Sequence, residues 1–597
     1  MRRLPLPVID AALALGGALA PLALQGIGDG SQEIGEKIAD KLPGWLEAAG
    51  RFKDTALGAS DNPLVVAAVV ATIVALVAVL AAIRLGVPAA SYHARAALRA
   101  RPSDLIVADR REEAVDNVVS MPVRLRWPDR RAHVQCLGPT GAGKTYALLP
   151  WIVQDLLAGR SVTIVQIYGD LADRALEYAD AMGATAHVCD FSDESSLKLN
   201  LLAGESTQKV ANRAASAVRA VASQYPHYQN VAEEATRRFV ILARSWAAHM
   251  GGSENDADIE LWRWLLYDRP ALDRILDVTY LQTDSGRRTG EVRVNAPWLN
   301  HFTATWFEQR FLVWSEQQRE HNIAGVEMFL NRILSEDAAR SRMCPDVSEP
   351  ELDLYGEMRS TAVHLSDAEA RDGAAPTLGK LMVIKAPVEA LDTEPARAIA
   401  YWALKTVQDA TMTRQEGADP LCVYLDELPT LIGKGHQEEV DAFTGWLANV
   451  RKLNVAVTVA YQGYSLLGDV LVGSLDTNGR NKLILGGLAE RDIHKVQRSL
   501  GEEQDVEDER YTEGALGTET VTSRGRRRQE KPSKSFDELK YMRRGESLWM
   551  GVKQGADQKP VKTRSRHLKP SDAYRKHQTQ HAKATAKASP NRRKARR

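Results

Sequence analysis

The sequence predicts an α/β protein: a nucleotide-binding domain built on a parallel sheet, interrupted by an all-helical insertion and preceded by a membrane hairpin. Three observations predict this class. Short β-branched strands alternate with helical patterns in two separate parts of the chain, which is typical of a parallel sheet covered by helices on both faces. Between about residues 206 and 342 the apolar residues take helical spacing instead. Near the start, 20 consecutive residues carry no charge.

Length and composition fit a protein of several folded domains. A chain of 597 residues exceeds what one hydrophobic core serves, and 44% hydrophobic with 26% charged residues is ordinary for globular proteins. The formal net charge of zero hides a basic end, because Lys559–Arg597 holds 14 Lys and Arg against one acid. The 4 cysteines form no CxxC pair, so neither a disulfide framework nor a zinc site is expected.

The membrane hairpin is predicted from two apolar segments. Residues 64–83 have the length that crosses about 30 Å of hydrocarbon. Residues 6–24 are interrupted by Asp10 and two prolines, and they fit either a first membrane helix or a signal peptide. The loop between the segments is acidic and arginines follow Ile83, so the positive-inside rule places the loop in the periplasm and the body in the cytoplasm. This predicts a multi-pass protein of the bacterial inner membrane.

These patterns divide the chain into five parts. The predicted parts are a membrane anchor (1–90), a first part of the nucleotide-binding domain (91–205), the all-helical insertion (206–372), a second part of the nucleotide-binding domain (373–555) and a basic, disordered tail (556–597). Within the second part, Glu502–Lys534 is rich in charge and glycine and is expected to be an exposed loop.

A glycine-rich motif predicts a phosphate-binding loop. The segment GPTGAGKT follows a predicted strand and precedes a helical pattern, which is the context that a P-loop requires. Its backbone N–H groups can cradle phosphates, Lys144 can reach the β- and γ-phosphates of ATP, and the Thr145 hydroxyl can ligate Mg²⁺. The predicted nucleotide-binding residues are Gly138, Pro139, Thr140, Gly141, Ala142, Gly143, Lys144 and Thr145.

A second motif supplies the acids that such a site needs. LCVYLDE is an apolar strand that ends in two carboxylates, the Walker B pattern. Its buried strand would deliver both acids at the edge where the P-loop lies. Asp426 is predicted to hold Mg²⁺, and Glu427 to polarise the attacking water.

The segment NVRKLNVAVTVAYQ offers a positive charge and a polar group for the same reaction. Either Arg451 or Lys452 could meet the charge that develops on the γ-phosphate, and Gln462 at the end of the strand could sense that phosphate. On the residues alone, the favoured interpretation of Arg451 is a solvent-facing charge at the end of a helix.

Taken in this order, the motifs resemble the TraG/TraD/TrwB-type coupling ATPases of type IV secretion and conjugation. The resemblance covers nearly the whole chain and rests on the membrane hairpin, GPTGAGKT, the helical insertion, LDELPTL and NVRKLNVAVTVAYQ. It implies a RecA-like motor domain in a homo-hexamer. In that family a basic residue 11 positions before the strand-end glutamine acts as an arginine finger toward the neighbouring subunit, and Arg451 and Gln462 have this separation. The family often carries an Asp-x-Lys-Gly-Glu stretch after the second strand, whereas this chain has QIYGD, so no role is carried over for that lysine.

The resemblance also implies partners. The expected function is a DNA-stimulated ATPase that links the relaxosome, its single-stranded or relaxase-bound DNA and the type IV secretion channel. Two alternatives stay open: a membrane-tethered translocase of the chromosome-segregation type, and a nucleotide-gated scaffold that recruits relaxosome proteins. The basic tail, ending in RRKARR, could bind DNA, dock on an acidic partner or stay solvated.

Overall fold

The computed structural model describes residues 105–114, 117–221, 226–282, 288–344, 350–359, 378–432, 437–500, 502–513, 520–532, 534–553 and 556–564. The chain divides into two compact units: Met1–Arg101 with Arg110–Pro122, and Pro102–Asp109 with Val123–Arg597. Strands β1 (Leu105–Ala114) and β2 (Asn117–Leu125) fall at this division. Within the described ranges no helix is long and apolar enough to cross a membrane. The two segments predicted to do so, 6–24 and 64–83, lie outside them.

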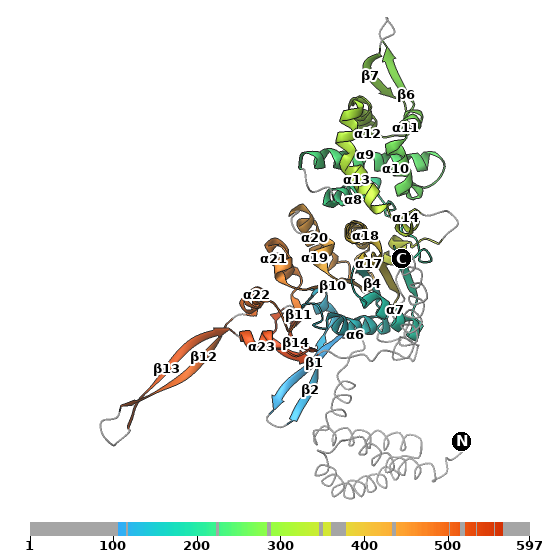
Figure 1. The fold of residues 1–597 in the computed structure, drawn as a ribbon. Helices are drawn as coiled ribbons and strands as arrows, with labels where there is room; N and C mark the ends of the chain where they lie inside the picture. The colour runs from blue at the N-terminus through green and yellow to red at the C-terminus, as the bar shows by residue number, and fades with distance from the viewer. Residues whose placement is uncertain are drawn as a thin grey trace, which may run out of the picture. The chain divides into compact units, whose positions relative to one another are not determined.

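The second unit is organised around a mostly parallel sheet (Figure 1). Seven of its strands pair in parallel. Strand β14 pairs antiparallel with β11, and β17 pairs antiparallel with β14, which gives the order β17-β14-β11-β3-β10-β9-β4-β8-β5. The strands are β3 (Val134–Leu137), β4 (Ser161–Gln166), β5 (Ala186–Asp190), β8 (Leu381–Lys385), β9 (Leu421–Leu425), β10 (Val455–Tyr461), β11 (Asn481–Leu485), β14 (Glu546–Met550) and β17 (Val561–Arg564).

The register of the central strands brings their carboxyl ends to one edge. Tyr461 at the end of β10 lies opposite Leu137 of β3, and Val459 lies opposite Leu425 of β9. These strands are buried along their whole length, as expected of apolar parallel strands covered on both faces. The segments that follow β3, β9 and β10 therefore emerge side by side.

Helices cover both faces of the sheet. On one face α6 (Lys144–Leu157) and α7 (Leu171–Met182) pack against alternate strand residues such as Ile164 and Tyr424. On the other face α18 (Thr393–Met412) and α20 (Gln437–Val450) pack against the residues between them, such as Val165 and Val423. The remaining elements of this part are α5 (Trp127–Arg130), α17 (Val388–Leu391), α19 (Leu428–Ile432), a 3₁₀ turn (Tyr464–Leu466), α21 (Asp469–Asn478), α22 (Glu490–Leu500), α23 (Phe536–Lys540), β15 (Val552–Lys553) and β16 (Ala556–Asp557).

A buried ionic group lies under α6. The Arg130 guanidinium makes a bidentate contact with the Asp155 carboxylate, and both side chains have no exposed surface. Arg160 lies 3.0 Å from the same carboxylate, and the Tyr424 hydroxyl donates to it at 2.7 Å. Burial opposes these charges, but the arginines hold the pKa of Asp155 below its usual value. The group joins α5, α6 and the central strand β9.

Between β5 and β8 the chain forms a helical region, α8–α15, of which α8–α14 are labelled in Figure 1. Its core includes Phe239, Trp306, Phe307 and Phe311, whose rings pack mostly edge to face. The elements are α8 (Thr207–Val221), α9 (Pro226–His249), a 3₁₀ turn (Glu254–Asp256), α10 (Ile259–Tyr267), α11 (Arg269–Ile275), β6 (Val278–Gln282), β7 (Arg288–Val294), α12 (His301–Trp306), a π turn (Phe307–Phe311), α13 (Glu316–Ile333), α14 (Asp337–Met343) and α15 (Leu354–Arg359).

Three expectations about these elements were wrong. The insertion is not all-helical, because β6 and β7, rich in β-branched residues, pair as an antiparallel hairpin. Residues 502–532 are not a loop but the long hairpin of β12 (Glu502–Glu513) and β13 (Thr520–Pro532). In its register Glu507 lies opposite Arg527 and Asp508 lies opposite Arg526. The acidic run on β12 therefore pairs with the basic run on β13, although both runs resemble loop sequence. The predicted tail begins too early, since β17 pairs with β14 and buries Thr563.

Candidate nucleotide site

The P-loop begins where β3 ends and is held there by its neighbours. The Gly138 N–H donates to the Tyr461 carbonyl at 3.1 Å, which fixes the start of the loop to β10. A Cβ on Gly138 would lie 2.8 Å from the Leu485 Cβ, so only glycine fits. Gly141 and Gly143 have φ values of +79° and +105°, which other L-residues avoid. Helix α6 starts at Lys144, so its first N–H groups and its positive dipole end face the loop.

Three predicted site residues meet beside this loop. The Lys144 Nζ donates to the Gly138 carbonyl at 3.0 Å and lies 3.4 Å from Glu427 Oε1. Gln462, the residue after β10, donates from its side-chain nitrogen to the same Glu427 oxygen at 3.2 Å. The three come from the ends of β3, β9 and β10, and the shared edge of the sheet brings them together. The position of the Glu427 carboxylate is thus set by the Lys144 ammonium and by the Gln462 amide.

Asp426 lies next to Glu427 with its backbone N–H directed to the Val165 carbonyl at 3.3 Å. It is 8% exposed, and its Oδ1 accepts from the Glu427 N–H at 3.1 Å. Burial and the neighbouring Glu427 charge raise the pKa of Asp426 to about 7, while Lys144 opposes the rise. A cation bound beside Asp426 would therefore favour the ionised form of this side chain.

Sequence reasoning missed the turn after β4, which belongs to this site. A Cβ on Gly169 would lie 3.8 Å from Asp426 Oδ2, and the charge of Asp170 contributes to the raised pKa of Asp426. Gln166 shapes the turn: its side-chain amide donates to the Gly169 carbonyl at 2.7 Å and accepts from the Ala172 N–H at 2.6 Å. The sequence did contain a signal for this turn, because QIYGD lies at the end of a central strand. It was overlooked because the segment was compared only with the Asp-x-Lys-Gly-Glu stretch, whose lysine it lacks.

Arg451 and Lys452 lie at the opposite edge of the sheet. They are exposed in the turn between α20 and β10, before the strand starts at Val455. Strand β10 separates them from Gln462, and at ~3.3 Å per residue it spans roughly 20 Å. Arg451 lies near buried His133, whose pKa is lowered to about 4 by burial and, to a lesser extent, by the Arg451 charge. Arg451 therefore cannot reach the P-loop of its own chain.

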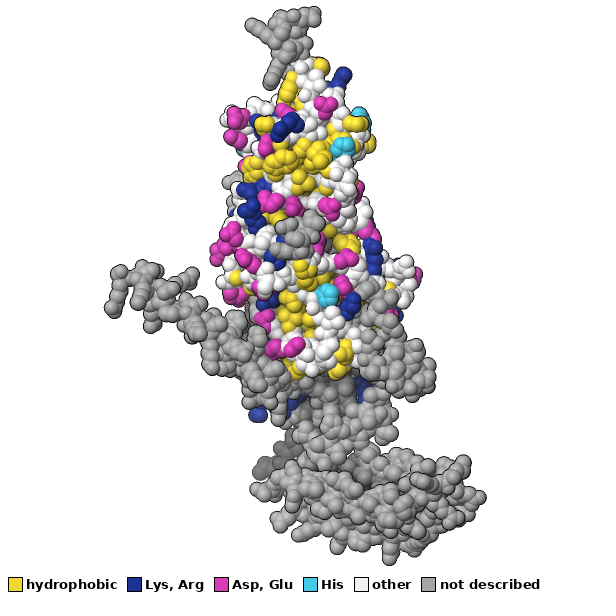
Figure 2. All heavy atoms as spheres, turned by 90° about the vertical axis from the view of Figure 1, so that its right-hand side faces the viewer, with side chains coloured by type: hydrophobic (Ala, Val, Ile, Leu, Met, Phe, Trp, Pro, Cys, Tyr) yellow, Lys and Arg dark blue, Asp and Glu magenta, His cyan; other side chains and the backbone are white. Residues whose placement is uncertain are grey.

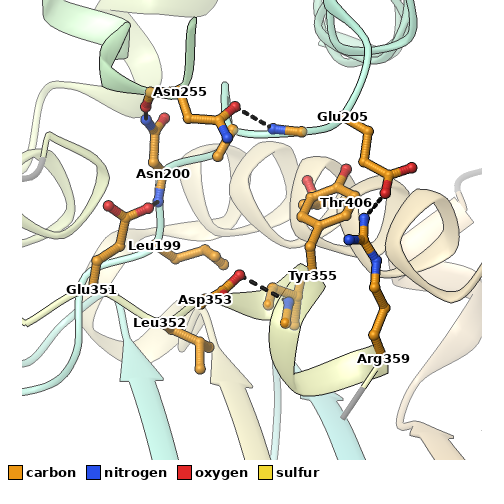
Figure 3. Close-up of a pocket in the computed structure, with 14 residues that line it drawn as sticks. Leu199, Asn200, Glu205, Asn255, Glu351, Leu352, Asp353, Tyr355, Arg359 and Thr406 are labelled. Carbon is orange, nitrogen blue, oxygen red and sulfur yellow. Dashed lines mark hydrogen bonds and ion pairs between the residues drawn. The ribbon is translucent and has the colours of Figure 1, made fainter. Parts of the chain in front are cut away.

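A cavity of about 660 Å³ lies away from these residues, where the helical region meets the sheet (Figure 3). Its walls come from the segment before α8, from α15 and from Thr406 of α18. Its polar groups are engaged in joining these elements: Asn200 donates to the carbonyls of Asn255 and Ala257, and Arg359 pairs with Glu205. The cavity contains none of the predicted site residues.

The fold and this site define a P-loop nucleotide-binding protein of the RecA-like class, in which strand β10 separates the P-loop strand β3 from the Walker B strand β9. No family model and no curated protein matches the sequence. Among solved structures, the bacterial conjugative coupling protein TrwBdeltaN70 in its unbound monoclinic form matches with a TM-score of 0.51 at 16% identity, over 75% of this chain and 88% of that one.

Two further structures align over similar lengths. TrwB in complex with ADP and Mg²⁺ has a TM-score of 0.47 at 16% identity, over 79% of this chain and 97% of that one. VirB4 of Thermoanaerobacter pseudethanolicus has a TM-score of 0.44 at 13% identity, over 79% of this chain and 98% of that one. The TrwBdeltaN70 match confirms at the level of fold the resemblance that the sequence motifs indicated.

Proposed function

We propose that this protein is a coupling ATPase of type IV secretion and conjugation, which uses ATP hydrolysis to drive DNA transfer. The observation that carries the proposal is the meeting of Lys144, Glu427 and Gln462 at the P-loop edge of a sheet whose fold TrwB shares. These groups are the phosphate ligand, the base and the polar sensor of an NTP hydrolase.

Each of these residues would have a separate role in hydrolysis. The P-loop N–H groups and Lys144 would hold the phosphates and neutralise their charge. Glu427 would accept a hydrogen bond from the attacking water and orient it, and Gln462 would keep that carboxylate in place. In a ring, Arg451 of one subunit would meet the γ-phosphate held by the next subunit.

The site also suits Mg²⁺, which one TrwB structure contains together with ADP. The Thr145 hydroxyl and the Asp426 carboxylate are oxygen donors of the kind that Mg²⁺ prefers. A side chain at Gly169 would come within 3.8 Å of Asp426 Oδ2, so the glycine leaves space beside that oxygen. Bound there, the ion would supply positive charge to the β- and γ-phosphates.

The finer parts of the proposal follow from the resemblance. They are a homo-hexamer anchored in the inner membrane by residues 1–90, with the motor in the cytoplasm, contacts with relaxosome proteins and with the secretion channel, and stimulation of the ATPase by DNA.

A nucleotide-gated scaffold is the second candidate, and one observation favours it. Figure 2 shows hydrophobic side chains gathered across the upper part of the described surface, which belongs to the helical region. The helical region exposes several large apolar side chains: Met250, Trp264, Tyr267, Phe302, Val313 and Met328. Apolar surface of this kind suits protein partners.

ATPase rates measured with and without single-stranded DNA separate the two candidates. A motor should hydrolyse ATP faster with DNA, whereas a scaffold should bind ATP and respond little. Lys144→Ala should abolish hydrolysis without unfolding, because it removes the phosphate-binding charge but no core volume. A Lys144→Ala protein that hydrolyses ATP at the wild-type rate would contradict the site. The exposed Lys495→Ala serves as the matched control.

A further inference from the structure

An aromatic ring beside the P-loop carries two guanidinium groups. Tyr146 follows Thr145 directly and lies in the first turn of α6. The Arg174 Cζ of α7 lies 5.0 Å from the centre of the Tyr146 ring, and the Arg544 Cζ, from the loop between α23 and β14, lies 5.4 Å from it. Both distances are within the ~6 Å at which a cation is attracted to an aromatic face.

Backbone packing holds the loop that carries Arg544 against the P-loop. Strand β11 runs parallel to β3, so Gly486 and Gly487 leave the sheet at the P-loop edge. The Gly487 N–H donates to the Lys540 carbonyl at 3.2 Å, and a Cβ on Gly486 would lie 2.5 Å from the Met542 carbonyl oxygen. A Cβ on Gly487 would lie 3.4 Å from the Pro139 Cγ. The loop therefore borders the P-loop, and glycines permit the close approach.

The two arginines differ in charge balance. Arg174 is paired with Asp170 at 2.6 Å. Arg544 is exposed, and no ion pair to it exists among the described residues. A P-loop cradles the α- and β-phosphates with N–H groups that include the first turn of the following helix. Arg544 has no ion-pair partner among the described residues, and it lies over Tyr146 in that first turn, beside the N–H groups that would hold the α-phosphate.

We propose that Arg544, stacked on Tyr146, binds the α-phosphate and ribose end of the nucleotide held by its own subunit. This inference rests on the proposed function, because it assigns a further ligand within the same nucleotide site. The α-phosphate is common to ADP and ATP and does not react. Arg544 therefore contributes to binding in the ground state and in the transition state alike, which changes KM and leaves kcat nearly unaltered.

The test compares Arg544→Ala with Arg543→Ala in the full-length protein. Arg543 is the neighbouring arginine of the same loop and is also exposed, so it controls for loss of surface charge. We expect Arg544→Ala to weaken the binding of fluorescent ADP and of a non-hydrolysable ATP analogue by the same factor, roughly 10- to 100-fold. The KM for ATP should rise with them, kcat should change less than about threefold, and Arg544→Lys should recover part of the affinity because it keeps the charge.

Equal affinities of the Arg544→Ala and Arg543→Ala proteins for both nucleotides would overturn the inference. Loss of affinity for the ATP analogue with ADP unaffected would also overturn it, because Arg544 would then face the γ-phosphate. Should Arg544→Ala fold poorly, Arg544→Gln, which keeps the length of the side chain, must show the same loss. A wild-type protein that binds neither nucleotide would instead contradict the proposed function, and Lys144→Ala reports on that question separately.

Discussion

At the residue scale, the site depends on a backbone conformation that most side chains avoid. Glu427 has a φ of +55°, in the left-handed region, although it is not glycine. Such a conformation costs about 1–2 kcal/mol for an L-residue. It turns the chain sharply at the end of β9, so that the Glu427 carboxylate meets Lys144 and Gln462 while Asp426 stays buried. Strain at this position is consistent with a functional requirement.

Glu427→Gln should separate nucleotide binding from hydrolysis. The amide fills the same space, so the affinity for ATP should stay within about threefold of wild type. It cannot act as a base, so kcat should fall by about 10²- to 10⁴-fold. Steady-state ATPase assays and nucleotide titration measure the two quantities, with the exposed Glu416→Gln as control. A Glu427→Gln protein with more than a tenth of the wild-type kcat would exclude Glu427 as the base.

A second residue-scale prediction concerns stability. Asp155→Ala would leave Arg130 fully buried without its bidentate partner, and breaking a buried pair in this way costs about 3–5 kcal/mol. Lys495→Ala removes an exposed pair with Asp469 and should cost less than about 1 kcal/mol. Urea unfolding followed by circular dichroism compares the two. Similar midpoints for both variants would show that the Arg130 group does not stabilise the fold.

At the element scale, the sequence was most informative where apolar runs are long and least where charge dominates. The strands β3, β4, β9 and β10 and the P-loop helix were predictable, because buried parallel strands leave unbroken apolar runs. The pairing of β12 with β13 was not, because its acidic and basic runs resemble a solvated loop until the register is known. Arg544 could not have been placed near Tyr146 from the sequence, since glycine packing around Gly486 brings the two together.

The junction between the helical region and the sheet domain contains a buried carboxyl group with a raised pKa. Glu439 of α20 is 3% exposed and faces Lys405, Arg219, Tyr401 and Glu233. Burial raises its pKa from 4.5 to about 7, although Lys405 and Arg219 oppose the rise. Arg219 of α8 also pairs with Glu438 of α20. This cluster therefore connects the insertion to α20, the helix that ends just before Arg451.

This raised pKa predicts a pH dependence of stability. Between pH 4.5 and about 7 the folded protein binds the Glu439 proton more tightly than the unfolded chain, so its contribution to stability is lost as the pH rises through this window. Glu439→Gln removes the effect. The difference in free energy of unfolding between Glu439→Gln and wild type should shift by about 2–3 kcal/mol in favour of the variant between pH 5 and pH 8. Urea unfolding at both pH values measures this, and exposed Asp441→Asn should show no such gain. If the two proteins differ in free energy of unfolding by the same amount at both pH values, Glu439 is not the group with the raised pKa.

At the scale of the whole molecule, the positions of Arg451 and the P-loop bear on assembly. The two lie at opposite edges of one sheet, separated by the length of β10, roughly 20 Å at ~3.3 Å per residue. A single chain therefore cannot use Arg451 on its own nucleotide. In a ring each nucleotide is completed at a subunit boundary, where an exposed arginine of the neighbour can meet it.

Arg451→Ala should accordingly bind ATP normally and fail to hydrolyse it, because an arginine finger contributes about 10³- to 10⁵-fold in rate. Its neighbour Lys452→Ala, equally exposed, should keep most of its activity. Mixing Arg451→Ala with Lys144→Ala should restore part of the ATPase, since a boundary can then pair an intact P-loop from one chain with an intact Arg451 from the other. ATPase assays on rings shown by cross-linking to contain both chains measure this recovery. No recovery in such rings would contradict action between subunits, and a reversed outcome for the two single variants would assign the role to Lys452.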